Sequence, residues 1–177
     1  NGVINSGVYT VTAVFSDSSG NYTDLIDLNA QLTIEKASYD MSGLIFSGIT
    51  TSYDTLVHSL ELSGIMPSDL SVNYLNNNQT EAGTYSVTAE FTSTDSNFKN
   101  PNSMTACLKI DKADYDISNI TFSDYTFDYN KNSHSIYISG ELPLGVEVIY
   151  LNSNKINSGI YEVEASFNHT NKNYNKI

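Results

Sequence analysis

The sequence has no arginine and no tryptophan, and only one of its 177 residues is a cysteine. All eight basic residues are lysines, and the 20 acidic residues bring the formal net charge to −12. Binding to nucleic acid depends on clustered lysine and arginine side chains that neutralise the phosphates. We therefore exclude nucleic acid as a partner.

Disulfides and long apolar runs are also missing. A single cysteine, Cys107, cannot form an intramolecular disulfide, so packing alone must stabilise the fold. No run of 18 or more apolar residues occurs, which predicts no membrane span in this stretch. Thirteen tyrosines and seven phenylalanines are too many for a disordered chain, so we expect an acidic, folded protein.

A repeat of 76 residues runs through the chain without a gap. Residues 38–101 and 114–177 share 24 identities in 64 aligned positions. We therefore divide the chain into the C-terminal part of one repeat (1–37), a complete repeat (38–113) and a repeat lacking its last strand (114–177), as in an excised piece of a longer array. Six residue types recur in all three segments: Gly7/Gly83/Gly159, Tyr9/Tyr85/Tyr161, Val11/Val87/Val163, Ala13/Ala89/Ala165, Phe15/Phe91/Phe167 and Asn21/Asn97/Asn173.

Alternating apolar and polar residues predict short β-strands, most clearly over 83–91 and its equivalents. Turn-forming residues separate these segments, and no helical stripe of useful length occurs. Because most connections are too short for parallel crossovers, we predict an all-β fold of antiparallel β-sandwich modules. Further strands are expected at Leu60/Leu62, Ile136/Ile138, Val72/Tyr74, Val148/Tyr150, Ala106 to Ile110, Met41 to Phe46 and, weakly, Thr51–Tyr53.

Longer motifs resemble a known family. Residues 82–91, followed by 108–113, resemble the final two strands of bacterial immunoglobulin-like repeats. Residues 39–43, 58–64 and 142–146 are similar to MBG-type repeats of large bacterial surface proteins. The resemblance covers the whole chain and implies tandem Ig-like antiparallel β-sandwich modules, secretion, tandem stacking, and adhesion or spacing without chemistry.

The chain departs from this family at two turns. Where the family turns on Tyr-Asp-Gly, residues 53–55 read Tyr-Asp-Thr and residues 129–131 read Tyr-Asn-Lys. Asp69 also replaces the glycine found at Gly145. We expect these turns to be reshaped.

No catalytic, cofactor-binding or metal-binding residue is assigned, and the chain is not expected to be an enzyme. His58 and His134 recur without a readable nucleophile, so a local hydrogen bond at a strand start is the better interpretation. His169 does not recur and is expected at the surface. Cys107 lies between inward-facing residues, so its thiol should point outward.

Two features of the junction between repeats give further hypotheses. Acidic residues at the repeat junction, Asp111, Asp114 and Asp116, offer oxygen ligands for Ca²⁺, although solvated charge is the default. Lys36 and Lys112 are candidates for an isopeptide crosslink to Asn21 or Asn97, although lysine side chains lying along the surface are the simpler account.

These observations favour a tandem Ig-like spacer or stalk in a bacterial cell-surface adhesin, extracellular and associated with the cell wall. Its partners are then the neighbouring repeats of the same chain. Two alternatives stay open. Tyrosine and asparagine side chains on loops are typical of adaptable recognition surfaces and favour a module that binds host glycan or mucin, a surface glycoprotein. An open sheet edge instead favours a surface filament, in which another copy of the chain donates a strand.

Overall fold

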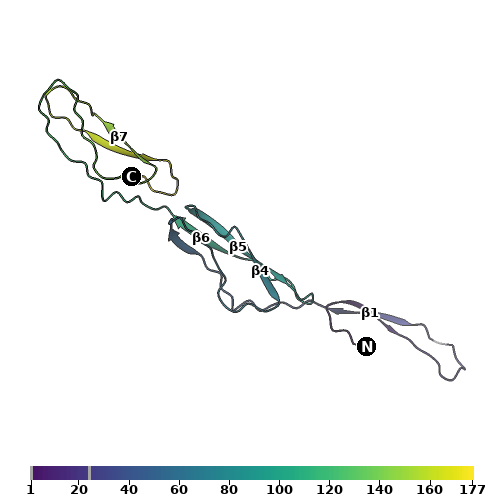
Figure 1. Cartoon of the computed structure of the whole chain (residues 1–177). Helices are drawn as coiled ribbons and strands as arrows, with labels where there is room; N and C mark the ends of the chain where they lie inside the picture. Colours follow the sequence, from purple (N-terminus) through teal and green to yellow (C-terminus); the bar gives the residue numbers. More distant parts are fainter. Residues whose placement is uncertain (1, 24) are drawn as a thin grey trace. The chain divides into compact units, whose positions relative to one another are not determined.

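A computed structural model describes residues 2–23 and 25–177 as an all-β protein with several small sheets (Figure 1). Within these residues there is no helix, and hence none long and apolar enough to cross a membrane. The strands are β1 (Gly7–Ala13), β2 (Leu28–Ile34), β3 (Ile49–Ser52), β4 (Leu70–Leu75), β5 (Gly83–Ser93), β6 (Met104–Asp111), β7 (Val146–Leu151) and β8 (Glu164–His169).

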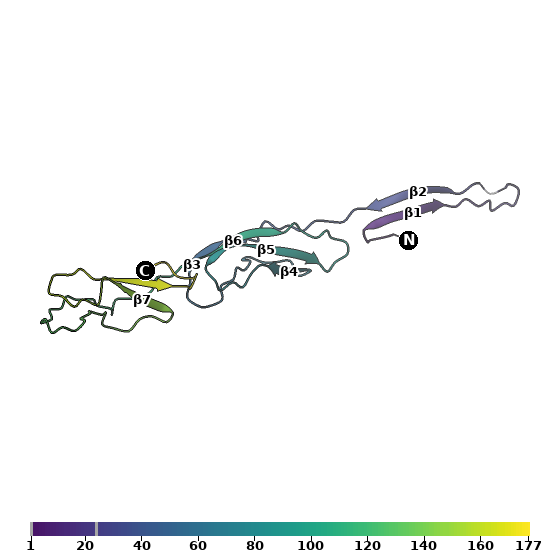
Figure 2. The same ribbon diagram turned by 90° about the horizontal axis from the view of Figure 1, so that it is seen from above.

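The strands form three sheets. Antiparallel hairpins join β1 to β2 and β7 to β8, and a four-stranded sheet has the order β3-β6-β5-β4 (Figure 2). The strands predicted over 83–91 and 106–110 are confirmed as β5 and β6. Their inward residues are apolar, and Val87 and Leu108 are fully buried.

The expectation that all strands pair antiparallel is wrong for β3. This strand runs parallel to β6, with Ile49 opposite Leu108 and Ser52 opposite Asp111. Residues 53–103 lie between the two strands and contain β4 and β5, so this long connection returns the chain to the same end of the sheet without a helix.

Two further predicted strands, at Leu60/Leu62 and Ile136/Ile138, do not form, although Leu60 is only 2% exposed. Side chains take the place of a partner strand here. The Leu60 N–H donates to Asn77 Oδ1 at 2.8 Å, and Asn77 Nδ2 donates to the Leu60 carbonyl at 2.8 Å. The Leu62 and Ile138 N–H groups donate to the hydroxyls of Tyr74 and Tyr150.

Residues 41–46 also form no strand and make a single antiparallel bridge, Ile45 to Ser63. Gly64 permits this close approach. It has φ = 107°, and a Cβ there would lie 2.1 Å from the Gly43 carbonyl oxygen. Gly140 repeats this geometry, with φ = 108° and a Cβ position 2.3 Å from the Asn119 oxygen.

The turns at residues 53–55 and 129–131 each contain a left-handed residue. Thr55 has φ = 72° and Lys131 has φ = 67°. Left-handed backbone is unfavourable for a residue with a side chain, most of all for a β-branched one such as threonine. Asp69 does not share the left-handed φ of 80° found at Gly145, although both turns close with the same kind of hydrogen bond, from the Leu70 N–H to the Pro67 carbonyl and from the Val146 N–H to the Pro143 carbonyl.

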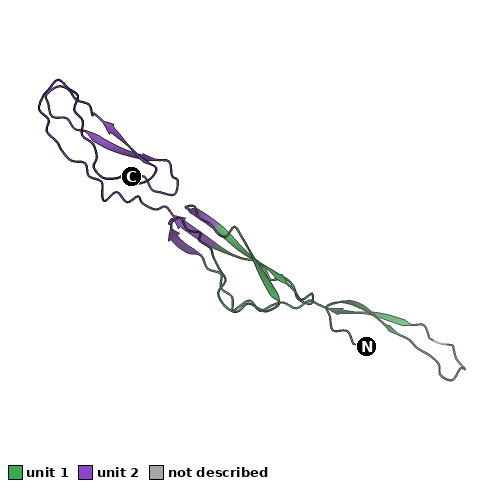
Figure 3. Cartoon of the chain, in the orientation of Figure 1, with its two compact units in different colours: residues 1–47, 60–77, 86–106 green, residues 48–59, 78–85, 107–177 purple. Residues whose placement is uncertain are grey.

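The chain divides into two compact units (Figure 3). The first contains residues 1–47, 60–77 and 86–106. Its core is centred on Leu44, Ala89 and Phe91, and is completed by partly buried side chains: Met41, Phe46, Leu62, Met66, Val72, Tyr74 and Met104.

The second unit contains residues 48–59, 78–85 and 107–177. Leu108, Ile110 and Val146 are its buried aliphatic side chains, and β7 and β8 form its hairpin.

The Leu60–Asn77 pairing generates a stability prediction. Asn77→Ala leaves the Leu60 N–H and carbonyl without these two hydrogen bonds in a buried position, which is expected to lower the free energy of unfolding by about 1–3 kcal/mol. Urea denaturation measures this change. The matched control is Asn73→Ala, an exposed position in β4, with an expected change within about 0.5 kcal/mol. Equal losses in the two variants would contradict the assignment.

Candidate functional site

The candidate site is the pair of joints centred on Ala37 and Ala113, where one repeat of the sequence passes into the next. The Ala113 N–H donates to the Asn173 carbonyl at 3.0 Å, and its carbonyl accepts from the Asn175 N–H at 2.8 Å. Ala37 makes the same pair of bonds with Asn97 and Lys99, at 2.9 and 2.8 Å. Each joint is thus a short parallel β-bridge, at Ala37–Phe98 or Ala113–Tyr174, and each lies inside one compact unit.

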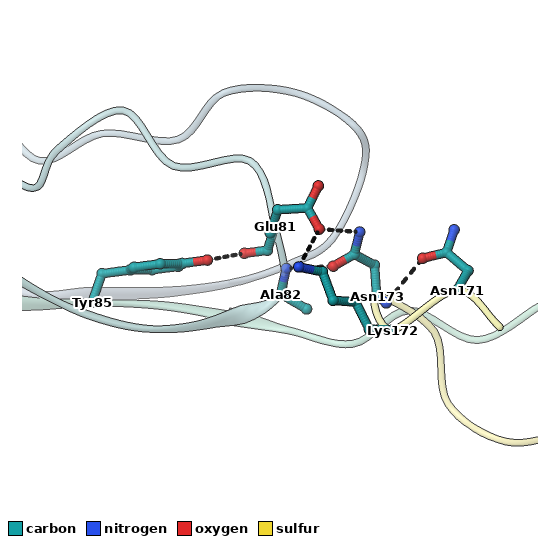
Figure 4. A network of polar contacts seen from close by, with 6 residues as sticks. All are labelled: Glu81, Ala82, Tyr85, Asn171, Lys172 and Asn173. Atoms are coloured by element: carbon teal, nitrogen blue, oxygen red, sulfur yellow. Dashed lines mark hydrogen bonds and ion pairs between the residues drawn. The ribbon is translucent and has the colours of Figure 1, made fainter.

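Asn173 makes the main side-chain contact of the second joint (Figure 4). Its Oδ1 accepts from the Ala82 N–H at 2.9 Å, and its Nδ2 donates to Glu81 Oε2 at 2.9 Å. Asn173 is only 4% exposed, the one buried polar residue in the described chain. The side-chain amide accepts from one group and donates to another, so both of its ends are satisfied. We call this arrangement the asparagine clasp.

A carboxylate reinforces the clasp at Asn173. Lys172 Nζ lies 3.4 Å from Glu81 Oε2, on the same oxygen that accepts from Asn173. The hydrogen bond from Asn173, followed by the contact with Lys172, lowers the pKa of Glu81. Glu81 is therefore held in its charged form at the joint.

Asn97 forms the same clasp in the first joint, 76 positions earlier. Its Oδ1 accepts from the Ser6 N–H at 2.7 Å, and its Nδ2 lies 3.4 Å from Asn5 Oδ1. Asn5 takes the place of Glu81 here, so this clasp has no carboxylate partner from residue 5. Asp95 instead accepts from Asn97 Nδ2 at 3.0 Å.

A tight loop presents each clasp asparagine. The Asn173 N–H donates to Asn171 Oδ1 at 3.0 Å, and the Asn97 N–H donates to Asp95 Oδ1 at 2.8 Å. These are Asx turns, in which a side-chain oxygen fixes the backbone two residues further on.

The third copy of this loop, at Asn21, uses a different residue. The Asp17 carboxylate accepts from the N–H groups of Ser19, Asn21 and Tyr22 at 2.9–3.0 Å. These bonds, with Ser19 contributing most, lower the pKa of Asp17 to about 2. A charged carboxylate at its start therefore holds this loop in the first segment.

A tyrosine connects the clasp to strand β5. The Tyr85 hydroxyl donates to the Glu81 carbonyl at 2.8 Å, so Glu81 is held through its backbone by Tyr85 and through its carboxylate by Asn173 (Figure 4). Tyr9 and Tyr161 make the same bond to the carbonyl four residues upstream. The Tyr85 ring folds back over Gly83, two positions earlier. A Cβ on Gly83 would lie only 3.0 Å from the Tyr85 hydroxyl, so glycine leaves room for the ring.

Stacked aromatic rings pack beside both clasps. Tyr115 stacks on Tyr174 with centroids 4.0 Å apart, and Tyr39 stacks on Phe98 at 4.5 Å. The Tyr174 ring also meets Tyr53 edge to face at 5.5 Å. Aromatic pairs of this geometry contribute about 0.5–1.5 kcal/mol beyond the area they bury.

The two stacked pairs differ in how the tyrosine hydroxyl is satisfied. Tyr39 Oη lies 2.7 Å from Ser93 Oγ. His169 stands where Ser93 does in the other joint, and the hydroxyl of Tyr115 and Nδ1 of His169 are both buried without a hydrogen-bond partner in the described structure. The expectation that His169 lies at the surface is therefore wrong, because its ring packs edge to face against Tyr115 at 5.0 Å.

The recurrent histidines make the local hydrogen bonds that the sequence favours. His58 Nε2 lies 2.9 Å from Asp54 Oδ1, and His134 Nε2 lies 2.9 Å from Asn130 Oδ1. Asn130 Oδ1 also accepts the Asn132 N–H, so this oxygen is an acceptor and His134 Nε2 must donate. The N–H of Leu56, and after it His58, lowers the pKa of Asp54.

The structure does not bring the junction aspartates together. Asp111 pairs with Lys109 at 2.8 Å, Asp114 accepts from Asn175 Nδ2 at 2.7 Å, and Asp116 closes a turn on the Ser118 N–H at 3.0 Å. No group of three or more histidine, cysteine, aspartate or glutamate side chains placed to hold a metal ion is found among the described residues.

The crosslink candidates are also separated from the chemistry they would need. Lys36 and Lys112 are exposed, so burial does not make either amine nucleophilic. Asn97 uses its amide in the clasp. Cys107 is exposed, and its thiol is free, as the sequence predicts.

Sequence reasoning found the recurrence of the clasp asparagine but missed its role. The identical 76-residue spacing of Asn21, Asn97 and Asn173 was the available signal. Its partner at Glu81 or Asn5 could not be found that way, because those two residues differ. No protein-family model, curated protein sequence or solved structure matches this chain.

The difference in hydrogen bonding between the Tyr39 and Tyr115 hydroxyls predicts different effects for two variants. Tyr39→Phe removes a hydrogen bond to Ser93 and is expected to lower the free energy of unfolding by about 1 kcal/mol. Tyr115→Phe removes a buried hydroxyl that has no partner, and is expected to be neutral or to stabilise by up to about 1 kcal/mol. Both variants retain the stacked ring, so each serves as the control for the other in urea denaturation. A larger loss at Tyr115 than at Tyr39 would be inconsistent with this difference.

Proposed function

We propose that this chain is a non-enzymatic stretch of tandem Ig-like modules that acts as a spacer or stalk in a bacterial cell-surface adhesin. The observation that carries the proposal is the recurrence of the asparagine clasp and the alanine bridge at both joints. A spacer requires the same joint each time one module follows another. Here the clasp and the alanine bridge of the first joint recur in the second joint, 76 residues further along the chain.

The Ig-like character of the modules is supported by the tyrosine bond. In immunoglobulin sandwiches a tyrosine two residues before the second disulfide cysteine hydrogen-bonds to backbone a few residues upstream. Tyr85 makes that bond and lies two residues before Val87, which is fully buried in place of a cysteine. An exported module built in this way needs no disulfide.

The packing around β5 is compatible with a sandwich. Ala89 and Phe91 on this strand contact Leu44, which comes from a segment outside the four-stranded sheet. The bridge from Ile45 to Ser63 joins the segments that would form the second layer. Leu60, held by Asn77, supplies a further apolar side chain to this layer.

The proposed mechanism is mechanical. Each joint is short, contains neither glycine nor proline in residues 36–40 or 112–116, and is hydrogen-bonded through both the N–H and the carbonyl of its alanine, Ala37 or Ala113. Such a joint restricts rotation between modules, so a series of them would project a distal region away from the cell wall. The partners in this function are neighbouring repeats of the same chain, and the extracellular, wall-associated location rests on the family resemblance.

Small-angle X-ray scattering on the 177-residue chain tests this function. A compact protein of this length has a radius of gyration of about 16 Å. We expect a clearly larger value for the chain, with a narrow distribution of maximum dimensions. Asn97→Ala with Asn173→Ala should broaden that distribution, because the joints lose their clasps while the strands remain.

The control replaces two exposed asparagines outside the clasps, Asn102→Ala with Asn168→Ala, and should leave the scattering curve unchanged. A wild-type radius near the compact value would refute the spacer. A distribution unaffected by loss of both clasps would show that the joints are fixed by something else.

A further inference from the structure

The aromatic cluster beside the second clasp contains a phenol and an imidazole whose polar atoms are buried and unpaired. The rings of Tyr115 and Tyr174 stack with centroids 4.0 Å apart and only 12° between their planes. His169 packs edge to face against Tyr115 at 5.0 Å. The Tyr115 hydroxyl and His169 Nδ1 have no hydrogen-bond partner among the described residues. Buried polar atoms normally have one, so this pair needs an explanation beyond packing.

The first joint shows that packing requires neither the second phenol nor the imidazole. There Tyr39 stacks on Phe98, and the Tyr39 hydroxyl lies 2.7 Å from Ser93 Oγ. Phe98 and Ser93 stand 76 positions before the tyrosine and the histidine of the second joint. The second joint thus keeps the same stack but adds a phenol on one side of Tyr115 and a base on the other.

This arrangement is suited to one-electron oxidation. A phenol that loses an electron also gives up its proton, and a base held beside it assists that step. A neutral imidazole has one ring nitrogen free to take a proton. His169 places such a ring against Tyr115, and Tyr174 lies in van der Waals contact on its face.

We propose that Tyr115 and Tyr174 form a modification site that takes a dityrosine crosslink, made by a peroxidase with hydrogen peroxide. Each phenol loses one electron and one proton; the Tyr115 proton passes to His169 Nδ1 and the Tyr174 proton to solvent. The two phenoxyl radicals join by a carbon–carbon bond between ring positions ortho to the oxygens. The hydrogens on those two carbons then move as protons to the oxygens, which restores both aromatic rings. Hydrogen peroxide takes up the two electrons and two protons and becomes two molecules of water.

Backbone contacts hold the two rings together before any oxidant acts. Ala113 and Tyr174 form the parallel bridge of the joint, and Tyr115 is two residues beyond Ala113. Tyr174 also follows directly after Asn173, which the clasp fixes. Rings positioned in this way react with each other in preference to tyrosines elsewhere.

The crosslink has a mechanical consequence. It closes residues 116–173 into a covalent loop, so tension along the chain on either side bypasses them. Closing a long loop also removes conformational entropy from the unfolded chain, as a disulfide does. This consequence rests on the proposed spacer function, whereas the crosslink itself rests only on the geometry of the rings.

The test treats the 177-residue chain with a peroxidase and hydrogen peroxide, at a dilution that suppresses coupling between molecules. Cys107→Ser is used throughout to remove the exposed thiol. We expect a monomer lighter by two hydrogen atoms, with dityrosine fluorescence and a crosslinked peptide that joins Tyr115 to Tyr174. Tyr174→Phe retains a stacked ring, as in the first joint, and should abolish this product.

Two further variants test the imidazole. His169→Ser reproduces the residue of the first joint and should slow crosslinking by about tenfold or more, because the base is lost. Ser93→His with Phe98→Tyr should instead create a second crosslink, from Tyr39 to position 98. Circular dichroism should show the same strand content in every variant.

Several outcomes would overturn the site: no coupling within the monomer, coupling of Tyr53 instead of Tyr115 to Tyr174, or an equal yield from Tyr174→Phe. An equal rate in His169→Ser would overturn the role of the imidazole. The crosslink is mapped by mass whatever the scattering of the chain shows. Failure of this site is therefore distinguishable from failure of the spacer.

Discussion

A single asparagine side chain can accept a hydrogen bond from one segment while it donates to another, and each joint of this chain depends on that property. Asn173 is buried and connects its loop to the Ala82 N–H and the Glu81 carboxylate. Neither alanine nor aspartate could make both bonds, because one has no polar group and the other cannot donate when ionised.

The other recurrent residues of the sequence support this contact in turn. Tyr85 fixes the carbonyl of Glu81, and Gly83 leaves room for the tyrosine ring that reaches it. Asn171 shapes the loop that presents Asn173. A repeat of this kind conserves its contacts more closely than its residues: Glu81 is replaced by Asn5 at the other joint, and Asp95 then supplies the carboxylate.

Period-two alternation was sufficient to predict β1, β5, β6, β7 and β8, because one face of each is apolar. It could not predict that Leu60 would have its backbone satisfied by Asn77, since a buried residue gives the same alternation with or without a partner strand. The parallel pairing of β3 depends on the path of a long connection, which local pattern does not specify. The clasp was missed because its partners are 91 residues apart and differ between joints.

The most direct test of the clasp is amide hydrogen exchange at Ala82 and Ser6. Their N–H groups donate to Oδ1 of Asn173 and Oδ1 of Asn97, respectively. Neither residue lies at the centre of a strand, so without the clasp both amides would exchange at rates close to those of an unstructured peptide. We expect both to be protected, and each to lose protection when its own asparagine is changed to alanine. Exchange at the unprotected rate in the wild-type chain would contradict the clasp as the constraint on which the joints depend.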